Sequence, residues 1–513
     1  MKAHILVADL GSSETELVLY DGLLAVLDST DFRTPFEEHD GVKSIDPRRY
    51  TEGLLDAADR LAVPRGSGNA LYVSTTGMGS TILTAAPVTV SKRGGVGRPA
   101  ALSPVLSWET ALKEAAAPAG GWSTVPLEAT GKTSLPTYPL FKIPELRRRL
   151  AESRGKRAAA CFVCLHDYIW TFLTGGCGFH TDFSLASRSM LFDDIDCRWD
   201  ARILAALGLA ESELPTAVPA GTLLGPVRPE LRRLLGWPAA SFVFAGMHDH
   251  AATTLTGLTL AGALHGSPTC GIWINPAGTT ESLASVADSG ESWIRALVKG
   301  APRLRLNTAR VWNEGLCALV CYPCLSGPVL RAAAEYGIGF DACLRTLGRI
   351  TATPSRRRLA AGDPGFVKIH GGHQAAFPDI AAARVVGVQY ELLAGIDDMQ
   401  ALFREVGGGL AAGNCREIVC LGGQARAPWL GRLKAAVLNR PVHVLAGENC
   451  AALGVALRFV ECTARSRPAG VRRRIARLAA SMQRHDPERE VATRIEVAYR
   501  EYRRVTAAWR KRE

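Results

Sequence analysis

Two short turns in this chain combine glycine with hydroxyl side chains, a combination that suits phosphate binding. The first follows the apolar run Ile5–Ala8 and contains Gly11, Ser12 and Ser13, and residues 278–281 (Gly-Thr-Thr-Glu) echo it. Glycine lets the backbone approach an anion closely, while hydroxyl and backbone N–H groups donate hydrogen bonds without adding positive charge. The pair therefore indicates two phosphate-binding turns that face one nucleotide.

Such a nucleotide site differs from the two best-known glycine-rich ones. No G-x-x-x-x-G-K-S/T segment is present, which excludes a P-loop, and no G-x-G-x-x-G follows a strand, as a dinucleotide site requires. Each turn also has an ordinary alternative, because Gly-Ser-Ser and Gly-Thr-Thr occur in hairpin loops. The surrounding elements decide between the two interpretations.

The elements that must position these turns alternate between strands and helices. Apolar runs predict strands at 5–8, 17–20, 70–73, 241–245 and 418–421, and helical spacing predicts helices at 51–63, 166–172 and 429–438. We expect Asp167 to cap the second of these helices, and a further short helix to begin at Trp108. Alternation of this kind predicts an α/β sheet, with a glycine turn after three of its strands.

Length and composition are those of a globular protein with two large domains or three small ones. Hydrophobic residues make up 47% of the 513 residues, but no uncharged apolar run approaches the roughly 20 residues that span a bilayer. The N-terminus is too short and too polar before its first strand for a secretory signal, so we expect a cytoplasmic protein without membrane contact.

The 13 cysteines are an odd number with mostly apolar neighbours, which favours reduced, buried thiols. Two C-x-x-C pairs, Cys161/Cys164 and Cys321/Cys324, leave a shared zinc site as an alternative to buried packing.

The formal charge of +11 is concentrated at the C-terminal end. Residues 464–513 contribute +9 of it, and their apolar positions recur at helical spacing from Ile475 to Trp509. This pattern predicts amphipathic helices whose arginines face solvent. We expect no nucleic-acid partner, because no aromatic stacking motif or recognition helix accompanies the charge.

Five segments taken in order resemble the signatures of the FGGY carbohydrate kinases. They are residues 9–13 with Asp21, 165–168 with 173–175, 246–250, 277–281, and 421–425 with 448–454. The resemblance implies two ribonuclease-H-like domains, as in actin and hexokinase, with ATP and a sugar in the cleft between them. It implies an N-terminal domain at 1–244, a C-terminal domain at 245–462 and a basic helical tail at 463–513 that packs on the latter.

The same resemblance assigns roles to individual residues. Asp249 corresponds to the catalytic base, and Asp9 to the acid near Mg²⁺ and the transferred phosphoryl group, so both carboxylates are expected to serve the metal, directly or through water. Residues expected to line the phosphates and the adenosine of ATP are Gly11, Ser12, Ser13, Gly278, Thr279, Gly422, Gly423 and Gln424. Residues expected near the substrate are Thr76, Met78, Trp108, Glu109, His248 and His250.

The sequence therefore predicts an ATP- and Mg²⁺-dependent kinase for a hydroxyl of a small sugar, ketose or polyol, and it leaves room for a homodimer. Two departures from the family pattern favour a relative that binds ligands without phosphoryl transfer. Glu16 stands where a Lys or Arg is common, and would repel a triphosphate unless it points away or holds a cation. The Trp-x-Asp-x-Arg sugar clamp is reduced to Trp108 and Glu109. A remote alternative is a metal-dependent hydrolase built on His248, Asp249 and His250.

Overall fold

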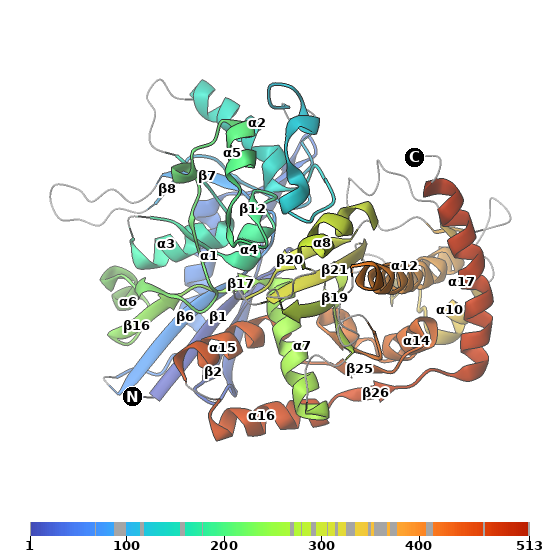
Figure 1. The fold of residues 1–513 in the computed structure, drawn as a ribbon. Coiled ribbons are helices and arrows are strands. Elements are labelled where there is room, and N and C mark those ends of the chain that lie inside the picture. The colour runs from blue at the N-terminus through green and yellow to red at the C-terminus, as the bar shows by residue number, and fades with distance from the viewer. Residues whose placement is uncertain are drawn as a thin grey trace. The chain divides into compact units, whose positions relative to one another are not determined.

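The computed structural model forms two compact units (Figure 1). The first comprises residues 1–256, 309–317 and 451–474, and the second comprises 257–308, 318–450 and 475–513. The structure describes residues 2–66, 68–86, 99–112, 117–153, 160–176, 178–266, 271–278, 280–288, 294–304, 306–312, 316–324, 334–346, 350–352, 367–369, 377–406, 414–464 and 467–510. Among these residues, no helix combines the length and the apolar composition that a membrane crossing requires.

The first unit is built on a twisted mixed sheet with the spatial order β15-β16-β6-β1-β2-β3. Its strands are β1 (Lys2–Leu10), β2 (Glu14–Asp21), β3 (Val26–Arg33), β6 (Asn69–Gly77), β15 (Leu223–Pro226) and β16 (Ala240–Phe244). The strands predicted at 5–8, 17–20, 70–73 and 241–245 are confirmed. β6 runs parallel to β1, to β16 and to the short β17 (Met247–His248), so these strands end at one edge of the sheet.

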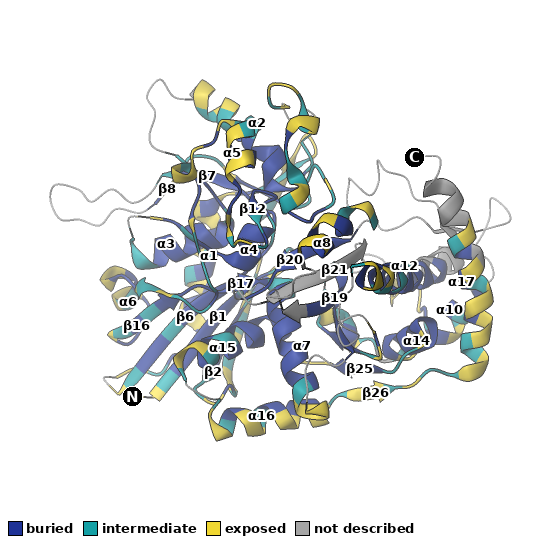
Figure 2. Ribbon diagram, viewed as in Figure 1, coloured by how far each residue is buried: buried dark blue, intermediate teal, exposed yellow. Residues whose placement is uncertain are grey.

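Helices cover this sheet with apolar side chains. α1 (Pro47–Arg60) buries Tyr50, Leu54 and Ala57, which confirms the helix predicted at 51–63. α3 (Leu165–Thr174) is buried at nearly every position of its length, as Figure 2 shows.

The helix α3 begins and ends where its sequence predicts. The Asp167 carboxylate accepts a 2.8 Å hydrogen bond from the backbone N–H of Cys164, so Asp167 caps the helix from its first turn. Gly175, at φ 69°, ends the helix in the left-handed conformation that glycine adopts without strain.

The short helix predicted from Trp108 is wrong, because Trp108 and Glu109 form a turn. Side-chain hydroxyls hold the backbone in this conformation. Ser107 Oγ accepts from the N–H of Glu109 at 3.2 Å, and Thr110 Oγ1 bonds to both backbone groups of Lys43 at 3.1 and 2.8 Å. Such local side-chain bonds compete with helix formation.

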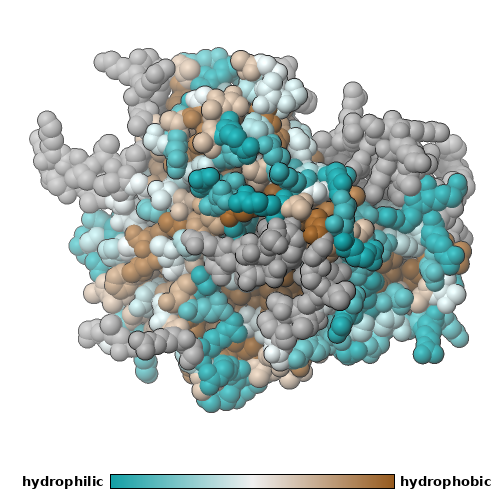
Figure 3. Space-filling view, viewed as in Figure 1, coloured by the Kyte–Doolittle hydropathy of each residue, from teal (hydrophilic) through white to brown (hydrophobic). Residues whose placement is uncertain are grey.

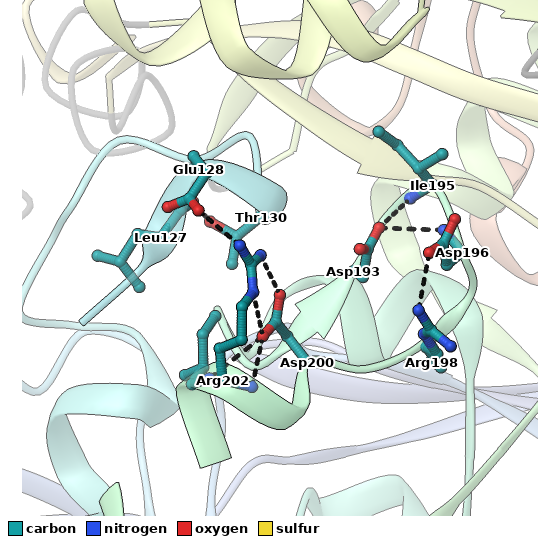
Figure 4. Close-up of polar contacts among 10 residues, drawn as sticks. Leu127, Glu128, Thr130, Asp193, Ile195, Asp196, Arg198, Asp200 and Arg202 are labelled. Atoms are coloured by element: carbon teal, nitrogen blue, oxygen red, sulfur yellow. Dashed lines mark hydrogen bonds and ion pairs between the residues drawn. The ribbon is translucent and has the colours of Figure 1, made fainter. Parts of the chain in front are cut away.

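A polar network stabilises the hairpin of β12 (Phe192–Asp193) and β13 (Arg198–Trp199) and the start of α5 (Ala201–Leu207). Asp200 caps α5 and also pairs with Arg202, which reaches Glu128 at 2.7 Å (Figure 4). Below this surface network lies a fully buried ion pair between Lys132 Nζ and Asp194 Oδ2 at 2.5 Å.

The second unit contains a seven-stranded sheet with the order β20-β21-β19-β18-β24-β25-β26. The strands are β18 (Ile272–Pro276), β19 (Glu281–Asp288), β20 (Asn307–Arg310), β21 (Leu316–Cys324), β24 (Glu417–Leu421), β25 (Val442–Leu445) and β26 (Gln483–His485). β18, β24 and β25 are parallel neighbours. The strand predicted at 418–421 is confirmed, and α14 (Pro428–Leu438) confirms the helix predicted at 429–438. The long helix α12 (Phe377–Glu405) also belongs to this unit.

The basic tail forms the predicted amphipathic helices α16 (Ala469–Ala480) and α17 (Arg489–Arg510). Apolar side chains such as Ile475 and Ile495 are buried, and hydrophilic side chains cover the visible face of α16 in Figure 3. Tyr499 of α17 donates a 2.7 Å hydrogen bond to Asp397 of α12, and Arg503 pairs with Asp398 at 3.1 Å. These contacts attach α17 to the second unit.

The cysteine pairs are only partly described. Cys161 and Cys164 are both free thiols of intermediate burial, and burial raises the pKa of each. The side chains of Cys321 and Cys324 lie outside the described residues, as does the shared zinc site considered above.

Close packing of two helices in the first unit requires a glycine. α7 (Asp249–His265) meets α15 (Cys450–Thr463) at Gly454, where a Cβ atom would lie 2.0 Å from the carbonyl oxygen of Ala252. Because the obstacle is backbone, it cannot move without displacing a helix.

We expect Gly454→Ala to lower the free energy of unfolding by about 1–2 kcal/mol, because a backbone obstacle puts the cost of overpacking at about 2–3 kcal/mol, the upper part of its usual range. This cost outweighs the roughly 1 kcal/mol that alanine gains over glycine inside a helix. Urea denaturation measures the change. Gly339→Ala is the control, because nothing lies within 4 Å of a Cβ atom there. Equal stability of Gly454→Ala and wild type would contradict this packing.

Candidate active site

Asp9 lies at the end of β1 and is held by Thr76 of the neighbouring β6. The Thr76 hydroxyl donates to Asp9 Oδ1 at 2.5 Å and accepts from the backbone N–H of Leu10 at 3.2 Å. Two hydrogen bonds on one buried hydroxyl fix the direction of the carboxylate at the sheet edge.

The first glycine turn follows directly. A Cβ atom on Gly11 would lie 2.4 Å from the carbonyl oxygen of Glu14, so only glycine fits this tight turn. Thr34 braces the turn, because its hydroxyl donates to Gly11 O at 2.7 Å and its N–H donates to Ser13 O at 3.1 Å.

The structure brings Trp108 to this turn. The indole Nε1–H of Trp108 donates to Ser12 Oγ at 2.9 Å, which joins a residue predicted for the substrate to one predicted for the phosphate. Glu109, beside it, is paired instead with Lys43. The Met78 side chain is 4% exposed and belongs to the hydrophobic core.

Asp249 is the first residue of α7, and β17 delivers it to the same edge of the sheet as Asp9. β17 pairs with β6 so that Met247 lies beside Thr76, the residue that also pairs with Asp9. With strands about 4.8 Å apart, the ends of β1 and β17 are separated by the width of one strand. Both predicted carboxylates therefore belong to one sheet edge within the first unit.

Among the described residues, one carboxylate oxygen of Asp249 has hydrogen-bond partners and the other has none. Oδ1 accepts from the backbone N–H of His250 at 2.7 Å and lies 3.1 Å from Nε2 of His248. No donor among the described residues reaches Oδ2. About 37% of the Asp249 side-chain surface is accessible, so the second oxygen is available to a ligand.

The surroundings of Asp249 change its acidity. Burial raises the pKa of this carboxyl group to about 6, although the His250 N–H and the positive charge of Arg188 act in the opposite direction. Burial, with Arg188 close by, also holds the pKa of His248 well below its ordinary value of 6.5. His248 is therefore neutral at pH 7, and its Nε2–H can donate to Asp249.

Arg188 is a site residue that the sequence analysis missed. It ends the short helix α4 (Phe183–Ser187), stacks on the ring of Tyr138 at 5.2 Å, and donates to the Tyr138 hydroxyl at 3.0 Å. One feature of the sequence points to it, because Arg188 is the only charged residue in the mostly apolar stretch 183–192. An arginine in such a stretch needs a partner with negative charge or acceptor groups.

Close packing fixes the ring of His248. A Cβ atom on Gly79 would lie 2.6 Å from this ring and 3.1 Å from Cγ of Arg188. Ser184 Oγ accepts the backbone N–H of His248 at 2.8 Å and is bonded in turn to Asp182 at 2.7 Å. The histidine thus has little freedom to rotate away from Asp249.

Glu16 does not point away from the first turn. In the antiparallel register of β1 and β2 it lies directly opposite Asp9, and in β2 and β3 it lies opposite Asp31. Directly opposite residues of antiparallel strands share a face, so three carboxylates line one face across three strands. This row is the surface that a divalent cation would neutralise.

The glycine turns of the second unit also meet. Gln424 donates through its side chain to Gly278 O and through its backbone N–H to Ala277 O at 3.1 Å. Gly422, at φ 113°, lies so close to Ala277 that a Cβ atom would be 2.7 Å from its carbonyl oxygen. Gly423 is exposed. Thr279 lies outside the described residues.

The geometry gives no support to the hydrolase alternative. The rings of His248 and His250 are 5.5 Å apart, and Nε2 of His248 is directed at Asp249. In the part of the chain that the structure describes, these three residues are not among the groups whose ligand atoms converge closely enough to hold a metal ion.

Comparison with known proteins finds similarity to carbohydrate kinases. Residues 123–256, which include Arg188, His248 and Asp249, match the model of the N-terminal domain of the FGGY family of carbohydrate kinases. Similar proteins include L-fuculokinase of Salmonella typhi, 35% identical over 150 residues (29% of each chain), and a glycerol kinase of Allorhizobium ampelinum, 25% identical over 224 residues (42% of this chain and 43% of that one). These matches span less than half of the relatives' length.

Solved structures of carbohydrate kinases match the fold along the whole chain. Xylulose kinase from Rhodospirillum rubrum has a TM-score of 0.74 at 19% identity and covers 99% of both chains. Gluconate kinase from Lactobacillus acidophilus has a TM-score of 0.73 at 14% identity and covers 99% of this chain and 98% of its own. The predicted two-domain fold of the actin and hexokinase type is thereby confirmed.

The pKa of Asp249 tests the electrostatics of this site. Because the charge of Arg188 lowers that pKa, we expect Arg188→Met to raise it above about 6. Carbon-13 NMR titration of labelled aspartates measures the shift, with the Asp249→Asn spectrum assigning the signal. Arg198→Gln, on a side chain that is 72% exposed, is the control. An unchanged pKa in Arg188→Met would contradict the interaction.

Proposed function

We propose that this protein is an ATP-dependent kinase of the FGGY type that phosphorylates a hydroxyl group of a small sugar, ketose or polyol. The observation that carries the proposal is the position of Asp9 and Asp249 at one sheet edge, where β1 ends in Asp9 and β17 leads into Asp249, both strands being paired with β6. A kinase needs a base for the acceptor hydroxyl and a charged group near the phosphates, and these carboxylates supply both. The named kinases among the relatives support the same reaction class.

Asp249 would accept the proton of the attacking hydroxyl through Oδ2. Its pKa of about 6 keeps the carboxylate ionised at pH 7 and makes it a stronger base than an exposed aspartate. His248 and the His250 N–H hold Oδ1, so the free oxygen keeps one direction. Arg188 would position the carboxylate and contact an acceptor hydroxyl through its guanidinium group.

Asp9 and the first turn would receive the phosphates. The N–H groups and hydroxyls of residues 11–13 donate to anionic oxygens, while Asp9 and Glu16 offer the carboxylate oxygens that Mg²⁺ prefers. When bound, Mg²⁺ neutralises the charge of the phosphate groups. In the second unit, Gly278 and residues 422–424 would border the adenosine and its phosphates, because bare backbone leaves room there for a flat base.

A relative that binds ligands without transferring phosphate is the second candidate. Glu16 favours it, because a carboxylate opposite Asp9 adds repulsion that a cation must offset. Calorimetry with ATP and Mg²⁺, followed by a panel of sugars and polyols, separates a binding protein from an enzyme.

We expect Asp249→Asn to lower sugar-dependent ADP release by about 10²- to 10⁴-fold, the usual contribution of a general base, while ATP still binds. A coupled ADP assay and calorimetry measure the two properties. Glu38→Gln, a change on an exposed strand, is the control. Full turnover of Asp249→Asn would refute the role of this residue.

The pH dependence of the wild type gives an independent test. The base must be deprotonated, and its folded-state pKa is raised to about 6, so kcat/KM should be constant near pH 8 and fall tenfold per pH unit below about 6. Initial rates at subsaturating substrate between pH 5 and 8.5 measure the profile. A limb near pH 4, the value for an ordinary aspartate, would contradict the assignment.

The Mg²⁺ requirement tests the carboxylate row. We expect Glu16→Gln to raise the Mg²⁺ concentration for half-maximal activity several-fold, because one anionic group beside Asp9 is lost. Glu37→Gln, on a residue that pairs with Arg49 away from the turn, should leave the requirement unchanged. A lower Mg²⁺ requirement in Glu16→Gln would show that Glu16 only repels the phosphates.

A further inference from the structure

A second cluster of chemically active side chains lies in the second unit, apart from every residue used above. His265 ends α7, Glu417 begins β24, and His443 lies in the adjacent β25. These residues come from three segments that are far apart in the sequence.

The two imidazoles converge on one carboxylate oxygen. Nε2 of His443 lies 2.7 Å from Oε2 of Glu417, and Nε2 of His265 lies 3.3 Å from the same oxygen. All three ligand atoms fall within 4.8 Å of one another, and the rings meet edge to face with centroids 5.8 Å apart. The cluster therefore presents two nitrogens and one oxygen to a common point.

We propose that His265, Glu417 and His443 form a binding site for a divalent transition metal of the Zn²⁺ class. Zn–N and Zn–O bonds of about 2.0–2.1 Å place the ligands of a tetrahedral ion about 3.3 Å apart. The separation between His265 and Glu417 already has this value. The His443 ring needs to move by only about 0.6 Å to reach it.

The three side chains differ in solvent exposure, and this leaves a path by which a metal ion can enter. The side chains of His443, Glu417 and His265 are 8%, 21% and 34% exposed, so the cluster is anchored on the buried side and open at His265. Three protein ligands leave the fourth position to water or to an external group.

Arg484 orients the carboxylate from outside. It faces His443 across the antiparallel pair of β25 and β26, and its Nη1 lies 3.5 Å from Oε1 of Glu417, the oxygen that the histidines do not contact. The arginine also pairs with Asp486 at 2.9 Å, which reduces its repulsion of a cation. A bound ion would join the C-terminal end of α7 to β24 and β25.

The metal site is tested by zinc titration of the full chain, followed by calorimetry and by thermal unfolding. We expect wild type to bind one more Zn²⁺ than His265→Ala or His443→Ala, and to gain several degrees in melting temperature that the variants do not gain. His39→Ala, on a side chain that is 81% exposed, is the matched control and should behave as wild type.

Two further measurements distinguish metal binding at this site from metal binding by cysteine thiols, and from a cluster that only forms salt bridges. Co²⁺ bound here should show ligand-field bands without a thiolate charge-transfer band, and the bands should be absent from His265→Ala. Arg484→Gln should bind Zn²⁺ more tightly, because a positive charge is removed while all ligands remain. Equal zinc stoichiometry in wild type and both histidine variants, or no zinc binding by wild type at pH 7.5, would overturn the proposal.

Discussion

Parallel pairing of β6 with both β1 and β17 is the constraint on which the rest of the candidate site depends. Parallel strands end at the same edge, so this pairing brings Asp9, Thr76 and the start of α7 together although they are far apart in sequence. The Thr76 hydroxyl then fixes Asp9 from the middle strand. Ligand-binding groups in α/β proteins gather at such an edge because each strand that ends there can release a loop or a helix toward the ligand.

Around this edge, charge is distributed in two regions. One side carries the carboxylates of Asp9, Glu16 and Asp31, and the other carries Asp249 with Arg188 and the neutral His248. The first region concentrates negative charge, and the second holds one carboxyl group whose pKa is raised by burial and lowered by the charge of Arg188.

Much of this arrangement could be predicted from the sequence, because periodic apolar runs and glycine turns are local signals. The strands, the helix caps of α3 and the amphipathic tail all follow from such signals. The expected helix at Trp108 does not form, because its local sequence has no strong preference and the neighbouring Thr110 hydroxyl bonds to the backbone of Lys43. Lys43 lies 65 residues before Trp108 in the chain, so a local pattern does not reveal this contact. Arg188 escaped notice because its place in the site depends on tertiary contacts with Tyr138 and on the effect of its charge on the pKa of Asp249. The composition of a structural unit from separate segments also could not be predicted from local sequence. Residues 451–474, for example, belong to the same unit as residues 1–256.

The contact between Gly79 and the His248 ring has a consequence for protein engineering. Because the space beside the imidazole is filled to within 2.6 Å of a hypothetical Cβ atom, position 79 tolerates no diversity without moving the histidine. Libraries that vary the site are better directed at Trp108, which is only partly buried and contacts the first glycine turn through the hydroxyl of Ser12.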